Sequence, residues 1–185
     1  MSIENLLKIV PPPAEPFEAF EGPWEPVESD LGTRLPEDYK AFARLYGSGY
    51  FMEFLGICVP VTANPNVRLA PFARSASENF RGYISLGDDV SYPVWPQAGG
   101  LLAFGGTDNG DYLFWLTEGA PEAWQVVVWA RDIQEFQVLD CNLTGFLAGL
   151  ASGDILPEDF PDDMLPCDLL FQPNSLFPIP TEDAG

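Results

Sequence analysis

The sequence contains no histidine and few basic residues, and both shortages restrict its possible functions. Without histidine, the chain lacks the commonest general base, the usual catalytic dyads and triads, and imidazole metal ligands. Only 8 Lys and Arg residues stand against 28 Asp and Glu residues, which gives a formal net charge of −20. Such a chain should repel nucleic acids and anionic membranes and attract a basic partner, although acidity can also serve solubility alone.

Cysteines and long apolar runs are also scarce. Cys58, Cys141 and Cys167 are widely separated and show no CxxC spacing, so the sequence predicts neither a thiolate zinc site nor any other cofactor. The N-terminal segment lacks the basic region of a signal peptide, and no apolar run is long enough to span a bilayer. We therefore expect a soluble, cytoplasmic protein with no membrane partner.

The chain has the length and the apolar content of one globular domain. It has 185 residues, of which 46% are hydrophobic and 14% aromatic. Residues 3–10 place apolar side chains at helical spacing, and Pro11–Pro13 end that helix. The Pro- and Glu-rich residues 11–23 are typical of an extended linker, so residues 1–23 are expected to precede the main domain.

Residues 24–51 predict two successive helices. The first ends at a Leu-Gly break, and the second opens at Leu35-Pro36 and closes at Gly47. Pro36 suits the first helical turn, where its missing N–H costs nothing. Apolar and aromatic side chains recur on one face of the second helix, which predicts that this face is buried.

The centre of the chain predicts a sheet. We expect strands at residues 54–61, in a hairpin over 101–116 with Asn109-Gly110 at its turn, at 124–130 and at 135–139. A weak helical pattern covers 71–81, and a final helix covers 142–152. The expected fold is therefore α+β, with an antiparallel meander sheet of about four to six strands packed against helices on one side.

The acidic, Pro-rich residues 156–185 form a distinct final segment. Its aromatic and leucine side chains are too apolar for a fully solvated tail. We expect it to pack as a strap over a main domain formed by residues 24–155.

The candidate functional residues are acidic or aromatic. Asp108 and Asp111 bracket the predicted Asn-Gly turn, where they would share a proton or hold a cation, or else serve only the turn itself. Asp88 and Asp89 would extend them into an acidic rim, or stand as independent surface charges. Trp95 lies between prolines in a predicted loop, where it is expected to be exposed as an aromatic anchor for a partner. These residues predict partner binding, and none is expected to ligate a metal.

The chain resembles the SUKH superfamily, which includes bacterial immunity proteins and the yeast cell-wall-synthesis regulators. The likeness begins at Trp24 with WEPVESDLGTRLPEDYKAF, returns with GGLLAFGGTDNGDYLFW and WQVVVW, and ends with LTGFLAGLASGDI. The resemblance covers residues 24–155 in blocks and implies an α+β domain that binds proteins without catalysis. Many bacterial members bind and neutralise a cognate toxin, often a nuclease.

Three functions remain open from the sequence. The first is a cytoplasmic immunity protein that neutralises a basic toxin. The second is an intracellular regulatory or scaffold domain that binds a peptide or protein. The third is an enzyme that uses Asp108 and Asp111 as a carboxylate pair. We expect a binding protein rather than an enzyme.

Overall fold

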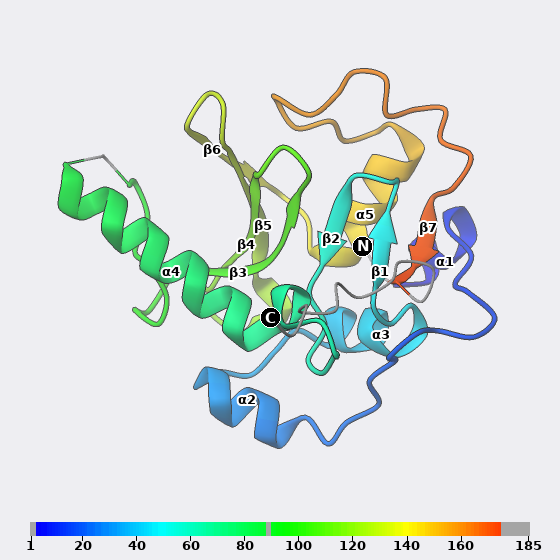
Figure 1. Ribbon diagram of the computed structural model, residues 1–185, viewed down its shortest axis with the longest axis horizontal. Coiled ribbons are helices and arrows are strands. Elements are labelled where there is room, and N and C mark those ends of the chain that lie inside the picture. Colours follow the sequence, from blue (N-terminus) through cyan, green and yellow to red (C-terminus); the bar gives the residue numbers. More distant parts are fainter. Residues whose placement is uncertain (1–2, 88–89, 175–185) are drawn as a thin grey trace, which may run out of the picture.

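The computed structural model describes residues 3–87 and 90–174. Figure 1 shows one sheet with helices around it. The helices are α1 (Ile3–Ile9), α2 (Glu25–Leu31), α3 (Glu37–Leu45), α4 (Leu69–Leu86) and α5 (Leu143–Ser152), with 3-10 turns at Pro65–Val67 and Pro121–Ala123. The strands are β1 (Gly49–Phe51), β2 (Leu55–Ile57), β3 (Leu101–Thr107), β4 (Tyr112–Leu116), β5 (Gln125–Ala130), β6 (Glu135–Leu139) and β7 (Phe171–Pro173).

The sheet confirms the predicted antiparallel meander and extends it. Its order is β6-β5-β4-β3-β2-β1-β7, and each neighbouring pair is antiparallel. The count is seven strands among the described residues rather than four to six. The two extra strands, β1 and β7, have three residues each, which is too short to leave a period-two pattern in the sequence.

Alternating side chains divide the core into two clusters, one on each face of the sheet. Leu113 and Trp115 of β4 point to the larger cluster, which α1, α3 and α5 cover. Phe114 and Leu116 point to the smaller cluster, which α4 covers through Ala76 and Phe80 (Figure 1). The expectation of helices on one side of the sheet was therefore wrong. The small buried residues of α4, such as Ala76 and Ser77, let this helix lie close to the second face of the sheet. Small residues contribute little to a helical pattern of apolar side chains, so the sequence did not reveal this buried helix face.

The predicted hairpin is present with Asn109-Gly110 in its turn, but the turn is not the two-residue type in which both residues have positive φ. Asn109 is not among the residues with positive φ, whereas Gly110 has a φ of 89°. The N–H of Gly110 donates to the carbonyl of Thr107, and that of Thr107 donates to the carbonyl of Asp111. The connection is thus three residues long, with glycine in the left-handed position, which is the next most common hairpin geometry.

The C-terminal segment packs against the domain as far as the structure describes it, which is residue 174 of the predicted 156–185. Phe160 and Phe171 are buried in the larger cluster, and β7 pairs with β1 from Gly49↔Pro173 to Phe51↔Phe171. Residues 175–185 lie outside the described residues. None of the helices within 3–87 and 90–174 combines the length and the apolar character needed to cross a membrane.

Candidate functional site

Asp108 and Asp111 lie in the same turn but have different roles. Asp111 is 2% exposed, and its carboxylate accepts hydrogen bonds from Thr107 Oγ1 at 2.5 Å and from the backbone N–H of Arg131 at 2.9 Å. Asp108 is exposed and accepts a hydrogen bond from the Tyr50 hydroxyl. Burial, together with this bond, raises the pKa of Tyr50 to about 12. The two carboxylates have separate partners, so Asp111 belongs to the turn and only Asp108 faces solvent.

Trp95 contradicts the expectation of an exposed aromatic anchor. Its side chain is only 8% exposed and belongs to the larger core cluster. Its carbonyl accepts a hydrogen bond of 2.7 Å from Arg81 Nη2 on α4. Trp95 precedes the first residue of β3, whereas Asp108 follows its last residue. The two side chains therefore lie at opposite ends of this strand and are not brought together. The flanking prolines indicated a loop correctly but gave no information about what packs against it. Asp88 and Asp89 lie outside the described residues.

The fold gathers acidic residues that are far apart in the sequence. In an antiparallel meander the β1–β2, β3–β4 and β5–β6 turns emerge at the same end of the sheet, which is the upper end in Figure 1. The segment around Phe160 joins them: the Phe160 ring contacts Phe54 with centroids 5.2 Å apart, and the N–H of Asp132 donates to Asp159. We call this region the turn end. Its acidic residues are Glu53, Asp108, Asp132, Glu135, Glu158 and Asp159.

Arg131 is the basic residue of the turn end, and its guanidinium is held on the β3–β4 turn. Its Nη1 donates to the carbonyl of Asn109 at 3.2 Å. Its backbone N–H is bound by Asp111, as described above. The positive charge is therefore fixed at one place, whereas the surrounding carboxylates leave the turn end acidic overall.

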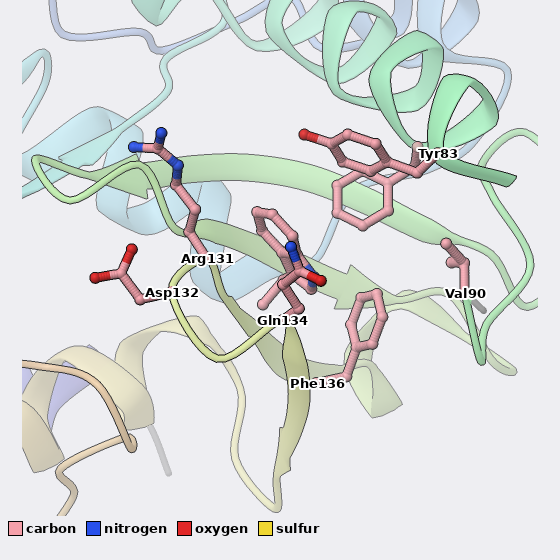
Figure 2. A pocket seen from close by; sticks show the side chains of 8 residues that line it. Tyr83, Val90, Arg131, Asp132, Gln134 and Phe136 are labelled. Carbon is pink, nitrogen blue, oxygen red and sulfur yellow. The ribbon is translucent and has the colours of Figure 1, made fainter. Parts of the chain in front are cut away.

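A groove opens beside the turn end, between the last turns of α4 and strands β5 and β6. Its volume is about 330 Å³. Figure 2 shows Tyr83 entering it from α4 and Phe136 from β6, with Val90 at one end and Arg131 and Asp132 at the other. The full lining is Phe80, Tyr83, Val90, Trp129, Arg131, Asp132, Gln134 and Phe136.

The groove walls are aromatic rings that are packed against one another and partly open to solvent. The Tyr83 and Trp129 rings are stacked with centroids 6.0 Å apart, and Phe80 meets Trp129 edge-on at 5.1 Å. Trp129 is 7% exposed, whereas Tyr83 and Phe136 are half-buried. Trp129 lies in the strand that the sequence predicted at 124–130, but the sequence did not identify the groove. Tyr83, at helical spacing from Phe80 beyond the predicted 71–81 helix, was the available signal.

The described parts of the chain contain no group of three or more Cys, Asp and Glu residues placed to hold a metal ion. Cys58 is buried, and burial raises the pKa of its thiol well above the usual range. Burial raises the pKa of Cys141 to about 11. Both thiols are therefore protonated at neutral pH, which makes them weak nucleophiles.

The fold and the site define an α+β protein built on one antiparallel meander sheet, with an acidic turn end and an aromatic groove. A family model described as SMI1-KNR4 cell-wall (SUKH_6) matches residues 21–147. This is well over half of the chain, and the chain belongs to that family, within the SUKH superfamily. Comparisons with curated proteins and with solved structures gave no match.

Proposed function

We propose that this protein acts by binding another protein, and that it is a cytoplasmic immunity protein that neutralises a basic bacterial toxin. Family membership supports a protein-binding role. The observation that carries the proposal is the turn end, where carboxylates from three turns and the C-terminal segment lie at the same end of the sheet as one tethered arginine. A basic toxin surface is the chemistry that complements such a region.

The charge distribution suggests how neutralisation would work. A chain with a net charge of −20 would steer a basic partner towards it and accelerate association, and salt would weaken that effect. If the toxin is a nuclease, its substrate-binding residues are basic because they contact phosphates. The carboxylates of the turn end would occupy the places of those phosphates and exclude the substrate.

The geometry of the predicted carboxylate pair favours binding over catalysis. An enzyme using Asp108 and Asp111 would need both carboxylates to reach a common substrate. Asp111 is buried and bonded to Thr107 and to the Arg131 N–H. Its carboxylate would therefore have to leave both partners before it could act.

The first experiment is co-expression with the nearest toxin-like gene upstream or downstream of this gene, with colony survival and co-purification as readouts. We expect survival that depends on this protein and a complex that weakens as salt rises. Cell death despite good soluble expression would contradict the immunity role. It would favour the alternative of an intracellular regulatory or scaffold domain, which the cell-wall description of the matching family also supports.

A matched pair of charge variants tests the turn end itself. The first carries Glu53→Gln, Asp108→Asn, Asp132→Asn and Glu135→Gln, and the control carries Glu→Gln at the exposed Glu15, Glu21, Glu25 and Glu118. Both remove four charges, so both weaken general steering equally. We expect the first to lose at least about tenfold in affinity for the toxin at low salt, and the control to lose less than about threefold. Equal losses of affinity in the two variants would show that the net charge of the protein, and not the turn end, determines binding.

A further inference from the structure

The aromatic groove has features that core packing alone does not explain. Its rings come from α4, β5 and β6, yet Tyr83 and Phe136 remain half-buried. Val138, two residues beyond Phe136 on the same face of β6, is 40% exposed. The volume of about 330 Å³ is at the lower end of ligand-binding pockets. The groove therefore has room for one or two side chains of a partner rather than for a folded element.

The charges near the groove select the kind of side chain. Asp132 is among the lining residues, and Figure 2 shows its carboxylate pointing away from the rings. Glu135 follows on β6 in the exposed part of the turn end. The only cation in the lining is Arg131, and its guanidinium donates to Asn109 on the neighbouring turn. The groove thus combines aromatic faces with the acidic turn end beside it.

We propose that the groove receives an arginine or lysine side chain of a basic partner protein. Its aliphatic stem packs on Tyr83, Trp129 and Phe136, and its charged head lies towards Asp132. Aromatic ring faces attract cations, and the long stems of Arg and Lys bury well against apolar walls while the head stays near water or a counter-charge. This inference rests on the proposed binding of a basic toxin and names the groove as the place where that partner is anchored.

A neutral apolar side chain fits the groove less well. It would cover the rings but would bring no positive charge to the acidic turn end beside the groove, so it would gain nothing from charge complementarity. A second copy of this chain would bring a further charge of −20 to an already acidic end, which opposes self-association. Charge complementarity therefore favours the cationic side chain of another protein.

The direct test uses the purified full chain and short synthetic peptides. One peptide has a Leu-Arg-Leu-Arg-Leu core, the second replaces each arginine by citrulline, which has nearly the same shape without the charge, and the third replaces each by glutamate. Binding is followed by two-dimensional NMR, which resolves the Trp129 indole N–H once it is assigned with Trp129→Phe. We expect the arginine peptide to shift the Trp129 and Phe136 signals and to bind about three- to thirtyfold more tightly than the citrulline peptide. The glutamate peptide should not bind.

Variants with matched controls make the test specific to the groove. Tyr83→Ala and Asp132→Asn should each weaken the arginine peptide at least about threefold. Tyr83→Phe, which keeps the ring, and Glu25→Gln, which removes a remote charge, should leave the affinity unchanged. Equal affinity for the arginine and citrulline peptides would overturn the proposal. So would signal shifts confined to other surfaces, or a concentration-dependent dimer that Tyr83→Ala abolishes.

The same variants separate this inference from the proposed function. If wild-type protein rescues cells from the toxin, and Tyr83→Ala rescues them with unchanged toxin affinity, the groove is not the anchor although the immunity role stands. If wild-type protein fails to rescue but binds the arginine peptide in the groove, the immunity role is wrong and the cation site stands.

Discussion

The two faces of the sheet bury the same strands in different ways. On the face of the larger cluster, α1, α3, α5 and the C-terminal segment cover the strands, and Leu31 of α2 and Leu69 of α4 also belong to this cluster. The largest side chains there, such as Trp115 and Phe146, are fully buried. On the other face α4 is the main cover, the contacts are mostly ring against ring, and Tyr83 and Phe136 keep part of their surface open. The first face thus mainly holds the fold together, and the second leaves room for a partner.

We call the face of the larger cluster the closed face and the other the open face. The largest effect of a substitution on stability should come from the closed face. Phe146 on α5 is 0% exposed within the larger cluster. Phe146→Ala should lower the free energy of unfolding by about 3–5 kcal/mol, because it removes a buried ring and leaves a cavity. Urea denaturation followed by tryptophan fluorescence measures this loss. A loss below about 1 kcal/mol would remove the contrast between the faces.

The two aspartates of the β3–β4 turn show the same contrast between a buried and an exposed group, because Asp111 is buried and Asp108 is exposed. Asp111→Ala should cost about 1–3 kcal/mol of stability, since it leaves the Arg131 N–H and the Thr107 hydroxyl without their acceptor. Asp108→Ala should cost less than about 1 kcal/mol, because Tyr50 and Asp108 meet at an exposed position. Thermal denaturation of both variants compares them, and a larger loss from Asp108→Ala would contradict the assignment of Asp111 to the turn.

On the open face, stability and binding should separate. Tyr83→Ala should cost about 1 kcal/mol or less of stability, because the ring is half-buried and the site opens to solvent. The same variant should lose affinity for the arginine peptide, as argued above. Chemical denaturation beside the peptide titration gives both numbers. A loss near that of Phe146→Ala would show that the second face is also part of the essential core.

The smallest effect concerns pH and lies on the closed face. Asp38 on α3 accepts a hydrogen bond of 3.0 Å from the N–H of Thr144 at the start of α5. Burial outweighs this bond and raises the pKa of Asp38 above its ordinary value. The folded protein therefore holds the Asp38 proton more tightly than the unfolded chain does. Stability from this group is fully present below the unfolded pKa and is lost as pH rises through the folded pKa.

Asp38→Asn keeps an acceptor for Thr144 and cannot ionise. Relative to wild type, the variant should therefore gain stability from about pH 4 towards neutral pH. Melting temperatures across that range test this. A difference that stays constant with pH would mean that Asp38 does not titrate differently in the folded and unfolded states.

The sequence predicted the parts of the fold that depend on neighbouring residues. The two helices before β1, the β3–β4 hairpin and the final helix all carry local signals, such as Pro36 before α3 and Asn142, whose side chain accepts from the Gly145 N–H at the start of α5. The length of α4 was underestimated, because Pro71 stands in its first turn and Gly82 near its end, and both weaken a helical pattern. The predicted strand at 54–61 is limited to Leu55–Ile57, because Val59 forms an isolated bridge with Arg68 instead of continuing the pairing with β3.

The candidate site depended on contacts that no local pattern encodes. Asp108 and Asp132 come together because alternate turns of a meander meet, and Asp159 joins them only through the packing of the C-terminal segment. The groove needs rings from α4, β5 and β6. Sequence reasoning identified the chemistry, acidic and aromatic, but the fold decided which of these residues face solvent: Asp108 does, whereas Trp95 and Asp111 are buried.

The pairing of β7 with β1 has a consequence for synthesis on the ribosome. Strands β3 to β6 follow one another closely in the chain, so their hairpins can form soon after they emerge. Phe51, by contrast, pairs with Phe171, and β1 must wait for most of the chain before that neighbour is made. Until then its backbone is an open edge, of the kind that other nascent chains can pair with. Its length of three residues keeps that edge short during translation, and arrival of β7 closes it.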